Sequence, residues 1–352
     1  MEPETGDIAR YPMRGALILG SARCGSTLVS RILNLHPAVL SVSELFASVG
    51  ANAFRPACLD GARFWSHLSR PSRAMSQVAN PAAAPTEFLY GDVAQPAHDP
   101  WHCPPILAVT LPHLTRDPDA MFQQLQARFR DAPRASMASH YRALFQAMAQ
   151  PAGGREIWVE RSGGSLLASG VLRAMFPEAA LVLLTRSGAE TALSMRDYPA
   201  ARLAIWCWHW LAPFGVDLLH PTRHFGRGGL WPWVAAWGGA GAVRRMIARR
   251  PSLALAGAFW SALTIRGLQG LRGTRPMVLP YRDLCHDPAP WIAALAAYLG
   301  CDAPADWLQR AARLPQARPD PLARLIVQDR DELTRACAPG EAALADFLAG
   351  LR

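Results

Sequence analysis

Short apolar runs alternate along this chain with stretches in which apolar residues recur at helical spacing. The first run, Ala16 to Leu19, ends at Gly20 and leads into a turn rich in glycine and serine. The apolar residues that follow lie on one face of a helix: Leu28, Ile32, Leu33 and Leu35. This opening segment predicts a strand, a loop and a helix, in that order.

Four further apolar runs are candidate strands: Ile106 to Leu111, Glu156 to Val159, Leu181 to Leu184 and Met277 to Leu279. The segments between them predict helices, among them helices within 117–150, one that ends near Phe176 and one over 291–299. Short strands that alternate with helices indicate a parallel sheet covered on both faces. We therefore expect an α/β fold, a P-loop-like three-layer α/β/α architecture with a central parallel sheet.

Two regions break this alternation. The segment 58–105 is rich in proline, alanine and serine, which predicts a long irregular insertion. The segment 203–260 holds seven of the twelve tryptophans, which fits either the core of a helical subdomain or an apolar acceptor pocket. Because sheets of this kind reach such lengths as one unit, we expect residues 1–352 to form a single domain with two insertions.

Composition narrows the class of protein. A chain with 51% hydrophobic and 18% charged residues can bury a core. The net charge of +9 rests on arginine alone, since the chain has no lysine, and it suits a polyanionic ligand or reflects a bias in composition. The seven cysteines form no metal-like cluster, so we expect no metal and reduced thiols in the cytoplasm. We also expect neither a signal peptide nor a membrane span.

The turn from Gly20 to Thr27 has the spacing of a nucleotide-phosphate loop. A loop between a strand and a helix presents backbone N–H groups to an anion. Loops that bind nucleoside triphosphates carry a lysine after their second glycine, whereas Ser26 stands here and Arg23 supplies a cation inside the loop. No candidate strand ends in an obvious Mg²⁺-binding aspartate. The loop therefore favours a nucleotide without a metal-clamped triphosphate.

Three groups of residues resemble motifs of a known family. RCGSTL at 23–28, LNLHP at 33–37 and SE at 43–44 resemble the first motif of bacterial sulfotransferases that use 3′-phosphoadenosine-5′-phosphosulfate (PAPS). FPEA at 176–179, LVLLTR at 181–186 and ALSM at 192–195 are similar to the family's 3′-phosphate segment. WVERS at 158–162 and LPYRDL at 279–284, with DP at 287–288, resemble two more of its segments.

The resemblance implies a set of donor-binding residues. Arg186 and Ser194 would bind the 3′-phosphate, and Tyr281 would lie beside the adenine or else serve only in a helix cap. The loop residues would hold the 5′-phosphate: Arg23, Cys24, Gly25, Ser26 and Thr27. The resemblance covers 15–46, 156–196 and 277–300; Cys24 and Arg282 depart from it, and no arginine-glycine segment completes the site. One phosphate contact therefore stays unassigned.

The reaction implied by the resemblance is in-line transfer of a sulfuryl group from PAPS to a hydroxyl of a small-molecule acceptor, such as a carbohydrate, lipid or natural product, with PAP as the other product. Such a step needs a cation for the leaving phosphate and a base for the hydroxyl. Arg23 is the candidate cation. Glu44, similar in position to the glutamate of carbohydrate-modifying relatives, is the first candidate base, and His113, at the end of the expected second strand, is its rival. Either residue could instead be structural.

Two other functions stay open as alternatives. A P-loop kinase for small molecules would need the missing lysine and a metal, and a non-catalytic nucleotide-binding module would bind PAP without transfer. A nucleic-acid partner is not expected, because the arginines do not interleave with aromatic residues in a recognisable module. The assembly state is open, with a homodimer among the alternatives.

Overall fold

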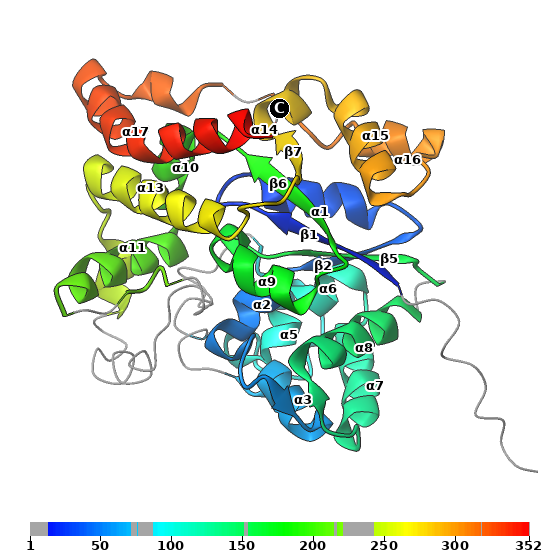
Figure 1. Cartoon of the computed structure of the whole chain (residues 1–352). Helices are drawn as coiled ribbons and strands as arrows, with labels where there is room; N and C mark the ends of the chain where they lie inside the picture. The colour runs from blue at the N-terminus through cyan, green and yellow to red at the C-terminus, as the bar shows by residue number, and fades with distance from the viewer. Residues whose placement is uncertain are drawn as a thin grey trace, which may run out of the picture.

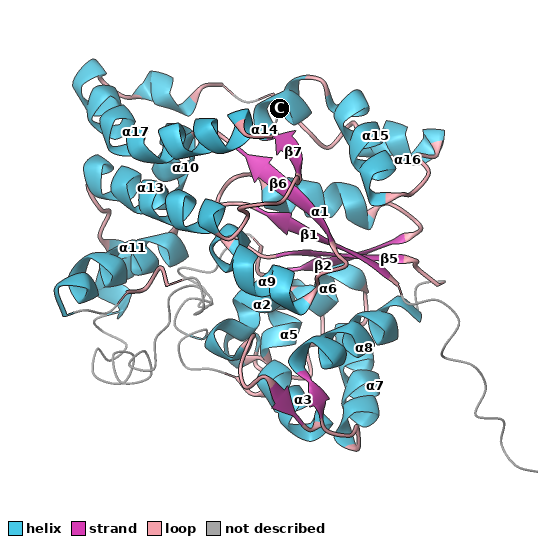
Figure 2. Ribbon diagram, viewed as in Figure 1, coloured by secondary structure: helices cyan, strands magenta, loops and turns pink. Residues whose placement is uncertain are grey.

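Five strands form one parallel sheet at the centre of the protein (Figures 1 and 2). The computed structural model describes residues 13–71, 76, 87–150, 154–214, 217–220, 243–317 and 319–351. The strands are β1 (Arg14–Leu19), β2 (Val39–Ser43), β5 (Ile157–Arg161), β6 (Ala180–Thr185) and β7 (Met277–Pro280). Their order across the sheet is β2-β5-β1-β6-β7, and every neighbouring pair is parallel. The expected α/β fold with a central parallel sheet is confirmed.

Strand β1 lies in the middle of the sheet, with β5 and β2 on one side and β6 and β7 on the other. Where connections leave a strand toward opposite sides, a crevice opens at the carboxyl ends of the parallel strands. The segments that follow these strands begin at Gly20, Glu44, Ser162, Arg186 and Tyr281. The sheet therefore brings the main sequence motifs to one edge.

The side chains of β1 alternate between the two faces of the sheet. Ala16 and Ile18 belong to a core with helices α1 (Ser26–Asn34), α15 (Pro288–Leu299) and α16 (Ala305–Ala311). Leu17 and Leu19 belong to a second core on the opposite face. The helices on that face are α2 (Leu45–Val49), α3 (Gly61–Ser69), α5 (Pro105–Ala108), α6 (Thr110–Leu114), α7 (Pro118–Arg130), α8 (Met137–Ala149) and α9 (Ser169–Met175).

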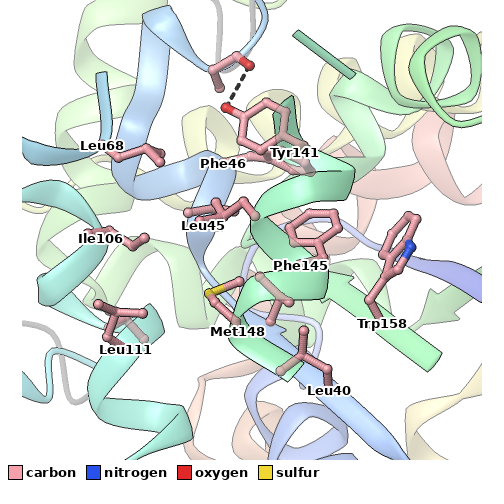
Figure 3. Packing of buried hydrophobic residues seen from close by; sticks show 14 of the residues in the cluster. Leu40, Leu45, Phe46, Leu68, Ile106, Leu111, Tyr141, Phe145, Met148 and Trp158 are labelled. Atoms are coloured by element: carbon pink, nitrogen blue, oxygen red, sulfur yellow. Dashed lines mark hydrogen bonds between the residues drawn. The ribbon is translucent and has the colours of Figure 1, made fainter. Parts of the chain in front are cut away.

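Aromatic side chains fill much of this second core (Figure 3). The ring centroid of Phe145 lies 4.8 Å from that of Trp158, and Phe46 meets Tyr141 edge-on at 5.0 Å. The buried hydroxyl of Tyr141 donates to the Ala53 carbonyl at 2.8 Å. Burial of each large apolar side chain contributes about 1.5–3 kcal/mol, so this layer fixes β2 and β5 firmly.

A further group of helices packs beyond the carboxyl ends of the strands: α10 (Gly188–Asp197), α11 (Pro199–Leu211), α13 (Leu253–Gln269), α14 (Tyr281–His286) and α17 (Val327–Ala349). Helices α13 and α17 lie side by side (Figure 1). The indole N–H of Trp260, on α13, donates to the Ser21 hydroxyl at 3.3 Å. This group is thereby tied to the loop after β1. Strands β3 (Cys58–Leu59) and β4 (Ala135–Ser136) form a separate antiparallel pair.

One expected strand was wrong, and one strand of the sheet was missed. Residues 106–111 lie in helices α5 and α6 instead of a strand, because an apolar run buried on all sides has no periodicity that separates the two forms, and Pro105 starts a helix. Strand β2 was not anticipated, because Ser41 and Ser43 interrupt its apolar run although all five residues are buried. The missed strand β2 forms one edge of the sheet, and α6, from the segment expected to be a strand, packs against it.

The regions expected as insertions contain ordered helices. Helix α3, inside the segment expected to be irregular, buries Phe64, Trp65 and Leu68 at helical spacing. Trp206, Trp208 and Trp210 lie on α11 and Trp260 on α13, whereas the remaining tryptophans of 203–260 fall outside the described residues. Among the described helices, none combines the length and apolar character of a membrane-crossing segment.

Candidate functional site

A cavity of about 1330 Å³ opens at the carboxyl ends of the strands. Eight residues expected from the sequence line it: Arg23, Gly25, Ser26, Thr27, Glu44, Arg186, Ser194 and Tyr281. Cys24 and His113 are not among its lining residues. The structure thus brings together most of the expected site and leaves two members of it outside.

The loop after β1 has an unusual backbone. Arg23 and Gly25 both adopt positive φ, at 65° and 100°, and α1 begins directly after them at Ser26. A Cβ on Gly25 would lie 2.1 Å from the ring of Tyr281, so both the backbone and the packing require glycine. Among the described residues no side-chain hydrogen bond caps α1, which leaves the positive end of the helix for an anion.

Arg23 reaches across the cavity to α10 and beyond. Its Nε donates to the Ser194 hydroxyl at 3.3 Å and its Nη1 to Glu87 Oε1 at 2.7 Å. The guanidinium also lies 4.3 Å from the centre of the Tyr198 ring. These contacts hold the cation of the loop over the cavity, and they join the loop to Ser194, a residue 171 positions away in the sequence.

Arg186 holds the other side of the loop. Its Nη1 donates to the backbone carbonyl of Arg23 at 3.1 Å, and its Nε and Nη2 donate to Glu190 Oε2 at 3.1 and 3.0 Å. The guanidinium lies 4.9 Å from the centre of the Tyr281 ring. Two arginines from different strand ends therefore face the same cavity, which suits a ligand with two separated anionic groups.

Cys24 points into the protein. Its side chain packs in the core between the sheet and α1, and burial raises the pKa of the thiol to about 11. The thiol is therefore neutral at physiological pH. Only the backbone of Cys24 is available to a ligand in the loop.

Glu44 forms a buried ion pair at the end of β2. Its Oε1 accepts from Arg161 Nη1, and its Oε2 accepts from the Gly163 amide at 2.9 Å. Arg161 also donates to the Ser43 hydroxyl at 2.6 Å, and its side chain is only 2% exposed. Arg161 was not proposed as a site residue, although the WVERS motif contains it. Both carboxylate oxygens of Glu44 are thus engaged, while its side chain still lines the cavity.

Glu160 lies behind this pair, fully buried. Its Oε1 accepts from the Ser162 hydroxyl at 2.6 Å, and Ser162 Oγ accepts from the Ala47 amide at 3.2 Å. Burial, with a further contribution from the negative charge of Glu44, raises the pKa of Glu160 to about 8. The Glu160 and Ser162 bonds tie the end of β5 to α2, whose first turn follows Glu44 directly.

His113 lies on α6 and does not line the cavity. Its Nε2 is 3.2 Å from the Ser30 hydroxyl and 3.3 Å from the Ser41 hydroxyl, and its backbone carbonyl accepts from Asn34. Burial, and then the nearby Arg161, lower the pKa of His113 to about 4. The imidazole is therefore neutral at pH 7 and is used in packing α6 against β2.

Glu87, Tyr198, Arg313 and Arg324 are among the cavity residues that sequence reasoning missed. Burial raises the pKa of Glu87, but the charge of Arg23, hydrogen bonds from the Glu87 backbone and from Arg23, and the charge of Arg161 together outweigh burial and hold that pKa below its usual range. Neither Glu87 nor Tyr198 lies in a motif, so no local signal marked them. Arg313 and Arg324 lie beyond the matched motifs, and only the excess of arginine pointed toward such residues.

No group of three or more histidine, cysteine, aspartate or glutamate side chains is arranged to hold a metal ion within the part of the chain that the structure describes. Arginine is the cation that lines the cavity, through Arg23, Arg31, Arg186, Arg313 and Arg324 among others. Guanidinium groups bind phosphate and sulfate oxygens through paired N–H donors.

Comparison with solved structures found bacterial sulfotransferases that align with most of this chain. The sulfotransferase domain of the olefin synthase from Synechococcus PCC 7002 aligns over 99% of this chain and 98% of its own length, at 16% identity and a TM-score of 0.44. A sulfotransferase from Mycobacterium avium aligns over 97% of this chain and 77% of its own, at 14% identity and a TM-score of 0.44. A search of the curated proteins gave no match.

The amino-acid sequence itself also matches a known protein family. A model described as the sulfotransferase family matches residues 16–209, which is more than half of the chain. The matched region contains the loop after β1, Glu44, Arg161, Arg186 and Ser194. The protein therefore belongs to the sulfotransferase family.

Proposed function

We propose that this protein transfers the sulfuryl group of PAPS to a hydroxyl of a small-molecule acceptor and releases PAP. The observation that carries the proposal is that Arg23, in the loop after β1, and Arg186, after β6, meet at this loop. Arg186 Nη1 donates to the Arg23 carbonyl, and both side chains line the cavity. PAPS carries a phosphosulfate at one end of its ribose and a 3′-phosphate beside it. Two fixed arginines suit these two anionic groups.

The loop and α10 supply the donor contacts in this proposal. Backbone amides of residues 24–27 bind the 5′-phosphate at the start of α1, and Arg186 with Ser194 binds the 3′-phosphate. Tyr281 packs against Gly25 and beneath Arg186, which suits a position beside the adenine. Arg313 and Arg324 also line the cavity and are candidates for the remaining phosphate contact.

In the chemical step, the acceptor oxygen attacks sulfur, the bond from sulfur to the bridging oxygen of the phosphate breaks, and that oxygen keeps the electron pair. Arg23 stabilises the negative charge that develops on the leaving phosphate. Glu44 takes the hydroxyl proton. We assign this role to Glu44 because it lines the cavity, whereas His113 does not and binds Ser30 and Ser41 instead.

The apolar side chains that line the cavity from α10, α11 and α13 suit the body of a small acceptor, among them Leu193, Leu203, Phe259 and Leu263. We further propose that the whole chain acts as one sulfotransferase domain, because α17 packs on α13 and α10 beside the site. A cytoplasmic location is supported by the seven cysteines, all of them described and none in a disulfide.

Nucleotide selectivity tests the proposal. If Arg186 and Ser194 bind a 3′-phosphate, PAP should raise the melting temperature of the protein well above its value with ADP at the same concentration. A ligand that binds only the folded state stabilises that state, and the tighter ligand stabilises it more. EDTA should leave the PAP effect unchanged. Equal stabilisation by PAP and ADP would refute the donor assignment, and a shift that needs Mg²⁺ with ATP would favour the kinase alternative.

A further inference from the structure

Glu87 is a carboxylate inside a site built for anions. Its Oε1 accepts from Arg23 Nη1 at 2.7 Å and, more weakly, from the Thr27 hydroxyl at 3.4 Å. Its Oε2 accepts from the Tyr198 hydroxyl at 3.3 Å. The side chain is 12% exposed, and its low pKa, set by Arg23 against the effect of burial, keeps it ionised at neutral pH. A fixed negative charge thus lies against the loop cation.

A bound donor and Glu87 compete for the same guanidinium. Arg23 donates from Nη1 to Glu87 and from Nε to Ser194, and one face of its guanidinium lies on the Tyr198 ring, so a ligand anion that needs Nη1 competes with Glu87. Two anions on one partly buried cation also repel each other strongly. A ligand group that takes the Nη1 donor of Arg23 must therefore displace the Glu87 carboxylate.

The donor PAPS and the product PAP differ in the group that would lie beside Arg23. PAPS carries a sulfuryl group beyond its 5′-phosphate, and PAP does not. The 5′-phosphate can bind the loop amides and Thr27, whose contact with Glu87 is long, while the shorter Arg23–Glu87 pair stays in place. The sulfuryl end of PAPS, together with the bridging oxygen on which charge develops during transfer, is the part of the ligand that takes Nη1 of Arg23.

We propose that Glu87 is a donor-specificity residue that occupies the sulfuryl position of the cavity whenever no sulfuryl group is bound. PAPS displaces the carboxylate from Arg23. After transfer the carboxylate returns to Arg23, so PAP gains no contact with that arginine and dissociates more readily. The inference rests on the proposed function of this same site.

Neutral variants of two glutamates test this idea with a matched control. Glu87→Gln removes the competitor for Arg23, whereas Glu190→Gln removes the charge that pairs with Arg186, on the side of the 3′-phosphate that both nucleotides carry. Titration calorimetry without acceptor would measure the Kd of PAPS and PAP for wild type and both variants. Chromatography of the recovered ligand would check that the PAPS is intact.

For Glu87→Gln we expect the Kd of PAPS to fall about tenfold or more and that of PAP to change less than about threefold, because a charge-assisted bond no longer has to be broken. Glu190→Gln should alter the two affinities by similar factors. Tyr198→Phe keeps the ring over Arg23 but loses the bond to Glu87, so it should favour PAPS in the same direction by a smaller factor.

The two proposals fail in different ways. If wild type binds neither PAPS nor PAP, the proposed function is wrong and this inference falls with it. If both nucleotides bind wild type but Glu87→Gln changes their affinities equally, or weakens PAPS, only the role of Glu87 is overturned. Melting curves and retained PAP binding show that each variant is folded.

Discussion

Replacing Glu44 by glutamine should reduce both the rate of transfer and the stability of the fold, and the two losses can be measured separately. The carboxylate is the proposed base, so its loss should lower the single-turnover rate about 100- to 10,000-fold. The same carboxylate is also the counter-charge of Arg161, which is 2% exposed. The variant therefore perturbs a catalytic group and a buried ion pair together.

The size of the structural loss follows from the contacts. The glutamine oxygen can still accept from the Gly163 amide, but its NH₂ group would face Arg161 Nη1, donor against donor. Leaving a buried arginine without its partner costs about 3–5 kcal/mol. Because one hydrogen bond survives and Ser43 still accepts from Arg161 Nη2, we expect the lower end of this range.

The assay combines urea unfolding with single-turnover transfer at saturating PAPS. The double variant Glu44→Gln/Arg161→Gln is the matched control, because removing both members of a buried pair is much less costly than removing one. It should regain most of the lost stability and none of the lost rate. PAP affinity, measured in parallel, shows whether the nucleotide site survives.

Two results would refute this reasoning. Normal transfer by a folded Glu44→Gln protein would show that the base lies elsewhere. Unchanged stability in that variant would show that Arg161 does not depend on Glu44, contrary to the ion pair between them. A double variant no more stable than the single one would lead to the same conclusion about the pair.

Arg23→Ala should keep PAP affinity within a few-fold while turnover falls about 100- to 1,000-fold, since the charge acts mainly on the leaving phosphate; wild-type turnover would remove Arg23 from the mechanism. His113→Asn should turn over near the wild-type rate at pH 7, and a loss of about 100-fold would restore His113 as the base. Since the folded pKa of His113 is about 4 and its ordinary value 6.5, the unfolded chain takes up the proton first as pH falls. Wild-type stability should thus decrease by up to about 3 kcal/mol between pH 6.5 and 4, and urea titrations of the asparagine variant should lack that decrease; an equal slope would contradict it.

The sequence by itself determined the local parts of this protein. The glycine-rich turn after a short apolar strand predicted a strand, a loop and a helix, and glycine permits the positive φ that the structure has at Gly25. Arg186 was assigned to the donor site through the resemblance to the family's 3′-phosphate segment, and it directly follows β6, at the sheet edge that the carboxyl ends of the parallel strands share. Patterns confined to a few residues are enough to predict such local elements and the residues at the ends of the strands.

Only the tertiary structure decided which distant residues meet. Glu87 bonds Arg23 from 64 positions away, and Arg161 bonds Glu44 across 117 positions, although no local pattern links either pair. His113 was excluded from the cavity because residues 106–111 pack as helices against β2 and turn its imidazole toward two buried serines. Side-chain charge is visible in a sequence, but the partner that it acquires depends on how separate elements pack, and that packing is a property of the whole core.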